Sequence, residues 1–277
     1  MKTSVIIPTY NRAHLLPRAV QSIPRAVDAE IIIIDDASTD DTHAVVTALQ
    51  HEDARIRFVP LSENRGVNYA RNRGIEIATS EWIQLLDSDD AFVPGGAERV
   101  GVYLDTTTDA NVVGFMTLRE VNGVMEPRGY RVGQEWKTAR PTYEDIALKR
   151  NIRGDVHYAI RRSVFAARHF FEDTRGFETE FFALIAKQGA RFLYVNETVD
   201  QRYSGTDYHL SDEPFKKYPR AFACGYKRFV LAHKTLLQAH PGTLRHYYLR
   251  IAKCLLATGN PLGVWWALKG ALIRTTS

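Results

Sequence analysis

"EIIIIDDASTDDT", residues 30–42, joins four consecutive isoleucines to a cluster of acids. A half-exposed strand alternates apolar and polar side chains, whereas a strand covered on both faces is apolar throughout. The isoleucine run therefore predicts a strand buried on both faces. The acids follow at the point where this strand leaves the core, and Ser38 or Asp40 is placed to cap a helix that begins there.

Three further apolar runs in the first hundred residues have the same character, and helical segments separate them. Strand and helix alternating at this spacing predict βαβ units and a parallel sheet. Right-handed crossovers then place the carboxyl ends of these strands on one edge. The apolar runs are residues 4–8, 30–35, 56–60 and 82–87, and the helical segments are 13–22, 40–50 and 66–78.

That edge is where open α/β sheets bind their ligands. The segments that follow the four strands are polar and carry acids or amide side chains. One polar loop would be ordinary, but four at the same edge predict a site for a polar ligand. They read "PTYNR" (8–12), "DDASTD" (35–40), "LSENRG" (61–66) and "DSDD" (87–90).

The segment "DSDD" places Asp87, Asp89 and Asp90 within four positions of one another. An Asp-x-Asp pair at a strand end directs two carboxylates to the same side. Mg²⁺ and Mn²⁺ prefer oxygen ligands and commonly take one or two protein carboxylates together with substrate phosphates. The segment therefore predicts a metal site. The alternative is that Asp89 or Asp90 caps the helix that begins near Pro94, which requires only one aspartate.

Other side chains at this edge suit a nucleotide. Asp35 and Asp36 stand at a strand end and can accept hydrogen bonds from a base or a ribose. Arg71 lies in a predicted helix about one turn from Asn68. An arginine there can bind phosphates or stack on a base. The alternative for Arg71 is a position on a solvated helix face.

Beyond residue 100 the alternation becomes less regular, although several elements are still predicted. We find no internal repeat and no low-complexity tract. The expected elements are paired strands at 111–121 and 124–132, a capping box at Thr142 and Asp145, a helix at 178–189, a strand at 191–196, and three helical stretches after 213 that are separated at 240–242 and 259–261.

Charge is unevenly distributed along the chain, whose total is +4. Residues 213–277 contain eleven Lys and Arg against one Glu, a net charge of +10, which leaves −6 for residues 1–212. No apolar stretch reaches the roughly 18–20 residues that span a bilayer, and the first apolar segment is short for a signal peptide. We expect a cytosolic chain in which Cys224 and Cys254 are reduced thiols.

Several function classes leave signatures that this sequence lacks. No Gly-rich fingerprint follows the first strand, and there is no Walker A motif, no nucleophile elbow and no Cys/His cluster at zinc spacing. Dinucleotide-dependent oxidoreductases, P-loop nucleotide hydrolases and zinc enzymes are therefore disfavoured. The basic segment has no recognised nucleic-acid-binding module, so we expect no nucleic-acid partner.

Four segments, in this order and spacing, resemble the N-terminal half of family-2 glycosyltransferases: "VIIPTYNR", "EIIIIDDASTDDT", "ENRGVNYARNRG" and "WIQLLDSDD". The resemblance is strong over residues 3–105, weaker over 150–205 and absent after about 210. It implies an α/β protein of the GT-A fold, a Rossmann-like mixed sheet that binds nucleotide-diphosphate sugars, here with a helical C-terminal extension.

The resemblance also implies a division of the chain. The expected parts are a GT-A catalytic domain at 1–210, composed of a nucleotide-sugar-binding half (1–105) and an acceptor and catalytic-base half (106–210), followed by a basic helical extension at 211–277.

Residue by residue, the resemblance assigns the donor side. Pro8 and Tyr10 would line the nucleotide pocket, and Asp36 would hydrogen-bond the base. Arg71 would lie close to the base or the diphosphate. Asp87 would contact the ribose or the sugar.

Two acids of the segment "DSDD" remain, of which Asp89 completes the DXD motif with Asp87. Asp89 would ligate Mn²⁺ or Mg²⁺ that bridges the diphosphate of a donor, which we expect to be UDP-linked. Asp90 is commonly acidic in the family and receives no role.

The family's catalytic acid pair opens a helix that ends in a Gly before a strand. In "GFETEFFALIAKQGARFLYV" (176–195) this frame places Glu178 at the position of the catalytic base. Phe177 stands where a second acid is usual. Glu180, Asp173 and Glu172 are competing candidates.

The implied activity is metal-dependent, inverting transfer of a sugar from a nucleotide-diphosphate donor to an acceptor hydroxyl, in bacterial surface polysaccharide or glycan biosynthesis. Glu178 would be the general base. The alternatives are a sugar-phosphate nucleotidylyltransferase, which would want a Gly-rich loop after the first strand, and a catalytically inactive nucleotide-sugar-binding module, which Phe177 favours.

The acceptor side is less clearly marked. We expect a glycan or lipid-linked acceptor, with "RNIRGDVHYAIRR" (150–162) as a candidate wall to which Asp155 and His157 contribute, although a lone histidine is more often structural. The basic residues after 213, with Trp265 and Trp266, suit peripheral contact with the inner face of the cytoplasmic membrane. The alternative is that these helices only pack on the catalytic domain.

Overall fold

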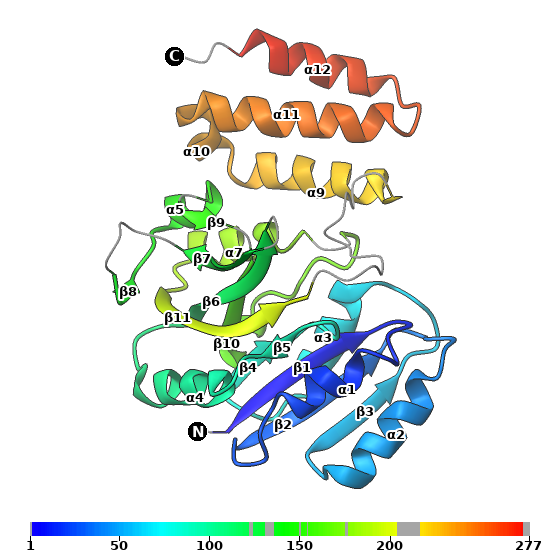
Figure 1. Ribbon diagram of the computed structural model, residues 1–277. Coiled ribbons are helices and arrows are strands. Elements are labelled where there is room, and N and C mark those ends of the chain that lie inside the picture. The colour runs from blue at the N-terminus through cyan, green and yellow to red at the C-terminus, as the bar shows by residue number, and fades with distance from the viewer. Residues whose placement is uncertain are drawn as a thin grey trace.

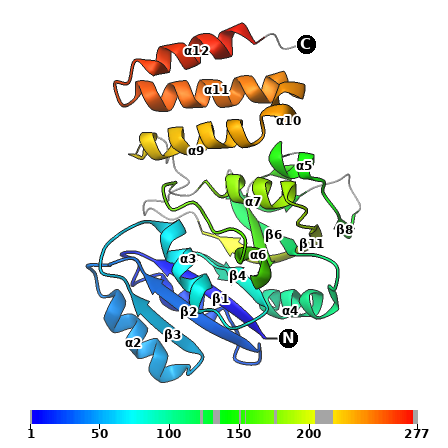
Figure 2. The same cartoon turned by 180° about the vertical axis from the view of Figure 1, so that it is seen from behind.

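A mixed β-sheet runs through the centre of the protein, and helices cover both of its faces (Figure 1 and Figure 2). The expected mixed α/β architecture with helices at its C-terminal end is confirmed. The computed structural model describes residues 2–121, 124–130, 136–149, 151–153, 155–174, 177–203 and 217–273.

The N-terminal strands are parallel and lie in the order β3–β2–β1–β4. This confirms the alternation of strands and helices predicted for the first hundred residues. The elements are β1 (Thr3–Thr9), α1 (Leu16–Gln21), β2 (Ala29–Asp35), α2 (Thr42–Glu52), β3 (Ile56–Pro60), α3 (Val67–Ile77) and β4 (Trp82–Leu85).

Strands β1 and β2 are buried along their whole length. Ile31 and Ile33 pack on the side of α1 and α2, whereas Ile32 and Ile34 pack on the side of α3. Each buried isoleucine side chain contributes roughly 1.5–3 kcal/mol. The unbroken isoleucine run is therefore explained by helices on both faces of the sheet.

The sheet continues through β10, β6 and β11 to β5, and β10 is antiparallel to both of its neighbours. The predicted pairing of β6 with β7 and the capping box at Thr142 are present. These elements are β5 (Ala91–Phe92), α4 (Gly96–Thr106), β6 (Val112–Val121), β7 (Val124–Tyr130), β8 (Thr138–Ala139), α5 (Tyr143–Ala147), β9 (Ile152–Arg153), β10 (Val156–Arg161), α6 (Arg162–Phe165), α7 (Glu178–Lys187) and β11 (Phe192–Arg202).

Strand β11 is longer than predicted. The expected strand ended at residue 196, but register shifts near Thr198 let the pairing with β6 continue to Arg202. Since β11 runs parallel to β6, and β10 is antiparallel to both β6 and β4, β11 points the same way as β4. Its carboxyl end therefore reaches the same edge of the sheet as the end of β4.

Helices α9, α11 and α12 form successive layers at the C-terminal end, with α12 outermost (Figure 1). The predicted breaks near 240–242 and 259–261 are present, and a further break at His233 divides the first stretch. None of the helices in the described ranges is long and apolar enough to cross a membrane. The four helices are α9 (Pro219–Ala232), α10 (Lys234–Ala239), α11 (Pro241–Leu256) and α12 (Leu262–Leu272).

Candidate active site

The loop after β2 anchors two neighbouring segments. Asp36 is buried, and its carboxylate accepts hydrogen bonds from the backbone N–H groups of Arg65 (2.9 Å) and Gly66 (2.7 Å). Asp35 accepts one from the backbone N–H of Ser38 (3.0 Å). The loops after β2 and β3 are thereby held together at the edge where the sequence predicts a ligand.

The first strand brings the other two predicted nucleotide contacts to this edge. Pro8 lies within β1 and pairs with Ile34 in the parallel ladder. Tyr10 follows the strand end, and its side chain is exposed. An exposed ring beside a buried strand end is available to a planar ligand such as a base.

Arginines neutralise the acidic segment after β4. Asp87 binds Arg71 through Oδ1 (2.8 Å to Nη2) and Arg202 through Oδ2 (3.2 Å to Nη1). Asp89 lies 3.3 Å from Nη1 of Arg12, and Asp90 forms an ion pair with Arg202. The repulsion among the three carboxylates is therefore compensated within the chain.

The ionisation of these acids depends on their surroundings. Burial opposes the charge on Asp87, but Arg71 and Arg202 outweigh burial and lower the pKa of Asp87. Burial raises the pKa of Asp90 well above its usual range, and the charges of Asp87 and Asp89 raise it further against Arg202. Asp87 is consequently the more strongly anionic of the two.

Arg71 joins this acidic segment to α7. Its guanidinium binds Asp87 through Nη2 and Glu178 through Nη1, the second at 2.6 Å. Arg71 is only 7% exposed, so a position on a solvated helix face is wrong. Burial opposes its charge, but Asp87 and Glu178 together raise the pKa of Arg71. The arginine brings together two acids that are far apart in the sequence.

The other candidate acids near α7 have different surroundings. Glu180 is fully buried and paired with Arg228, which also binds both carboxylate oxygens of Asp173 at 2.8 Å. Glu172 accepts a hydrogen bond from Asn72 (3.0 Å). Of the four acids, Glu178 is the one that lines a cavity with Arg71 and Asp87.

That cavity has a volume of about 170 Å³, and Lys149, Asp155, Tyr158 and Arg202 also line it. Asp155 thus occupies the predicted acceptor side. His157 does not, because it is fully buried between Gln84 and Asp200. The expectation that His157 faces an acceptor is therefore wrong, and its structural alternative is right.

Sequence reasoning missed Arg202, Tyr158 and Lys149. Arg202 could have been found with the rule applied to the first four strands, namely that side chains at the carboxyl ends of parallel strands lie close together. It was overlooked because β11 was expected to end at residue 196. Tyr158 lies in β10, within the segment 150–162 expected as an acceptor wall, but it was not singled out there. Lys149 follows the short helix α5 and carries no comparable signal.

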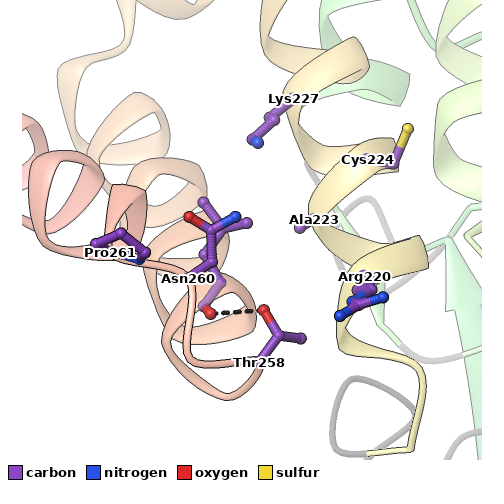
Figure 3. A pocket seen from close by; sticks show the side chains of 8 residues that line it. Arg220, Ala223, Cys224, Lys227, Thr258, Asn260 and Pro261 are labelled. Atoms are coloured by element: carbon purple, nitrogen blue, oxygen red, sulfur yellow. Dashed lines mark hydrogen bonds between the residues drawn. The ribbon is translucent and has the colours of Figure 1, made fainter.

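A larger cavity of about 530 Å³ lies between α9 and the turn that joins α11 to α12 (Figure 3). Arg220 and Lys227 of α9 stand on one side, and Thr258 and Asn260 of the turn stand on the other. No acid lines this cavity, whereas Asp87, Asp155 and Glu178 line the smaller one.

The acidic segment suits a divalent metal only as part of a larger ligand set. Within the ranges that the structure describes, no three His, Cys, Asp or Glu side chains are grouped as a metal centre. Asp89 offers a hard oxygen ligand at a strand end. Mg²⁺ and Mn²⁺ accept one or two protein carboxylates when phosphate oxygens and water supply the rest. Asp89 fits that arrangement.

Comparison with known proteins gives concordant results. Residues 4–172 match the model of the family described as "Glycosyl transferase family 2". The chain is 29% identical over 198 residues to the GalNAc(5)-diNAcBac-PP-undecaprenol beta-1,3-glucosyltransferase of Campylobacter jejuni, covering 70% of this chain and 62% of that protein. The chain thus spans less than two thirds of this relative's length.

Two groups of solved structures share the fold. Residues 1–349 of S. aureus TarS in complex with UDP-GlcNAc superpose with a TM-score of 0.66 at 17% identity, over 98% of this chain and 89% of that one. The mannosyltransferase PcManGT of Pyrobaculum calidifontis, in complex with GDP-Man and Mn²⁺, gives 0.57 at 19% identity, over 97% and 79%. The fold is therefore GT-A, as the sequence resemblance implied, and the chain belongs to glycosyl transferase family 2.

Proposed function

We propose that the protein transfers a sugar from a nucleotide-diphosphate sugar to an acceptor hydroxyl with inversion at the anomeric carbon. The observation that supports this most is Arg71, which binds Asp87 and Glu178 in one cavity. A donor-side acid and a candidate base thus face the same space. The resemblance of the chain to a lipid-linked glucosyltransferase and to UDP- and GDP-sugar complexes favours glycosyl over nucleotidyl transfer.

The donor side uses the edge of the parallel sheet. Tyr10 and Pro8 line the nucleotide pocket, and Asp36 accepts a hydrogen bond from the nucleotide base. Asp87 contacts the ribose or sugar, and Arg71 stabilises the diphosphate. We propose a UDP-linked donor, since TarS was solved in complex with UDP-GlcNAc.

Glu178 acts as general base. It takes the proton from the acceptor hydroxyl while that oxygen forms a bond to the anomeric carbon, on the face opposite the diphosphate. The bond between the anomeric carbon and the diphosphate oxygen breaks, and its electron pair leaves with the diphosphate. Asp89 would hold a Mn²⁺ or Mg²⁺ ion, which would supply positive charge to the leaving group. Arg71 orients the Glu178 carboxylate during the transfer.

Release of nucleotide diphosphate from a panel of UDP- and GDP-sugars, with Mn²⁺, Mg²⁺ or a chelator, tests the proposal. We expect metal-dependent release from one donor and inversion in the product. Asp89→Ala should abolish metal-dependent donor binding, whereas Asp109→Ala, which removes a surface ion pair with Arg140, should leave it intact. Donor binding without release of diphosphate, in the presence of candidate acceptors, would instead support the inactive binding module that Phe177 favours.

We further propose that the acceptor is a glycan or lipid-linked, and that residues 213–277 contact an anionic membrane surface from the cytoplasmic side. The described part of this segment, 217–273, contains no acidic residue. Five large apolar side chains of α12 are exposed, and Lys269 Nζ lies 3.8 Å from the Trp265 ring centroid. The exposed side chains are Leu262, Val264, Trp265, Leu268 and Leu272.

Co-sedimentation with vesicles that contain phosphatidylglycerol tests the membrane contact. The double variant Trp265→Ser/Leu268→Ser should pellet several-fold less than the unmodified protein, because insertion of apolar area drives interfacial binding. Val102→Ser alters an equally exposed apolar residue on α4 and should have no effect. Equal pelleting of all three proteins would exclude α12 as the contact surface.

A further inference from the structure

A chain of buried polar side chains lies behind the acidic segment. His157 in β10 contacts Asp200 in β11 (Nδ1 to Oδ2, 3.1 Å) and Gln84 in β4 (Nε2 to Oε1, 3.0 Å). His157 and Asp200 are fully buried and Gln84 nearly so. Burying a histidine and an aspartate is costly unless they are paired. This chain is therefore a specific arrangement within an otherwise apolar sheet.

The direction of these hydrogen bonds follows from Thr3. Its hydroxyl donates to the carbonyl oxygen of Trp82 (3.1 Å), so it accepts from Gln84 Nε2 (3.1 Å). The amide oxygen of Gln84 then faces His157 Nε2, which must carry a hydrogen. His157 Nδ1 and Asp200 consequently share one proton between them. The imidazole is held on both sides, and the Asp200 carboxylate is held through Oδ2.

Asp200 in turn lies beside Arg202. The two residues are two positions apart on β11 and share one face of the strand. Asp200 Oδ2 is 3.9 Å from Arg202 Nη2, and Arg202 Nη1 binds both Asp87 and Asp90. The guanidinium thus connects the buried pair to the acidic segment.

The Asp200–Arg202 contact has unused hydrogen-bonding capacity. Asp200 Oδ1 and Arg202 Nε are buried, and neither has a hydrogen-bond partner within the described part of the chain. A metal ion that competes for Asp87 and Asp90 would therefore allow Arg202 to strengthen its contact with Asp200.

We propose that His157 and Asp200 are positioning residues, which hold Arg202 so that it fixes the acidic segment and directs a guanidinium at the donor diphosphate. This inference rests on the proposed function for the identity of the ligand. It adds His157, Asp200 and Arg202 to the residues that shape the donor site. No sequence motif marks any of the three. His157 and Asp200 act through Arg202 and do not touch the donor.

The first test needs no nucleotide. The backbone N–H of Asp90 donates to the carbonyl oxygen of Asp87 (3.0 Å) within the acidic segment. In Asp200→Asn, which keeps the size of the side chain but weakens its hold on Arg202, we expect this amide to exchange with solvent roughly tenfold faster. Unchanged exchange in Asp200→Asn would overturn the inference.

The matched control is Glu180→Gln. It also turns a fully buried, arginine-paired acid into its amide, but its partner is Arg228 of α9. If Asp200 had only a structural role, the exchange rate of the Asp90 amide should respond equally in both variants. The positioning role predicts faster exchange at Asp90 in Asp200→Asn alone.

The second test measures binding of UDP and GDP with Mn²⁺ by calorimetry. We expect about a tenfold higher Kd for Asp200→Asn and for Arg202→Lys, and less than a hundredfold for the double variant, since both changes act through one guanidinium. Loss of folded protein would lower the measured stoichiometry and leave the Kd unchanged. If the unmodified protein binds neither nucleotide, the proposed function fails, while the exchange test still decides the positioning role.

Discussion

The N-terminal strands and the C-terminal helices are built in opposite ways. Residues 31–34 of β2 are completely buried, whereas in α12 only Gly263 and Gly270 are buried. The N-terminal half packs its apolar residues against its own helices. The C-terminal helices instead share a core with α5 and α7 of the preceding part. Strand β2 is thus buried beneath helices of its own half, whereas the helix of the candidate base is supported by residues from the end of the chain.

Phe177 explains this dependence. It stands where the resemblance led us to expect an acid, and its ring lies 4.9 Å from the ring of Tyr226 and 5.9 Å from that of Phe229, both in α9. Gly225 allows the close approach, because a Cβ there would lie 3.0 Å from the Phe177 ring. The residue next to Glu178 is therefore a docking point for α9.

The largest expected effect is on the turnover rate of the transfer reaction. Glu178→Gln should lower turnover by roughly 10²–10⁴-fold, because a general base contributes that much. Nucleotide binding should change little, since the glutamine oxygen still accepts from Arg71. Steady-state release of diphosphate and calorimetry measure the two. Glu172→Gln, which changes an acid that does not line the cavity, is the control. Turnover within tenfold of the unmodified protein would place the base elsewhere.

Breaking the contact between the two regions should have the next largest effect. Arg228→Ala leaves Glu180 buried without its partner, which costs about 3–5 kcal/mol for buried pairs. Chemical denaturation measures the loss. Arg220→Ala, on the exposed side of the same helix, should change stability by less than about 0.5 kcal/mol. Similar losses in both variants would mean that α9 does not depend on this ion pair.

Acid should weaken the C-terminal helices first. Burial lowers the pKa of His233 to about 4, and the charge of Lys187 contributes to the shift. The unfolded chain takes up this proton near pH 6.5, so stability present above 6.5 is lost as the pH falls toward 4, by about 3 kcal/mol at most. Amide exchange in α9 and α10 between pH 7 and 4 measures it. In His233→Asn, the stability of α9 and α10 should depend less on pH over this range. An unchanged dependence on pH would assign the loss of stability to another titratable group.

The N-terminal sheet should respond at lower pH. Burial acts to raise the pKa of Glu30, but hydrogen bonds from Ser4, Thr79 and Ser80 outweigh burial and lower it to about 2. A lowered acid pKa contributes stability above about 4.5, which is lost as the pH falls toward 2, by roughly 2–3 kcal/mol. Acid titration of Glu30→Gln against the unmodified protein measures it. Parallel titration curves would contradict the prediction.

The contrast also explains what the sequence could reveal. The strands of the first half were predictable because continuous apolar runs are a local signal, and Asp36 and Asp87 followed from the edge at which those strands end. Arg71, Asp87 and Glu178 were each identified, but their pairing was not, because the 107 positions between Arg71 and Glu178 leave no local pattern. The length of β11, and with it Arg202, depends on register shifts that periodicity does not show.

The second half was less predictable for a related reason. Phe177 was seen only as a missing acid, since its partners in α9 lie some 45–50 residues later. His157 was considered as an acceptor contact because its neighbours Gln84 and Asp200 come from two other strands. Both residues derive their roles from the tertiary packing.

Because three arginines pair with the acidic segment, we expect folding of the protein to be independent of metal binding. In a protein whose carboxylates need a cation for neutrality, removing the metal also removes part of the folding free energy. Here Arg12, Arg71 and Arg202 supply that positive charge from within the chain. A chelator should therefore leave the melting temperature unchanged. If the proposed metal dependence holds, we expect metal supply to control the activity of the protein and not its lifetime.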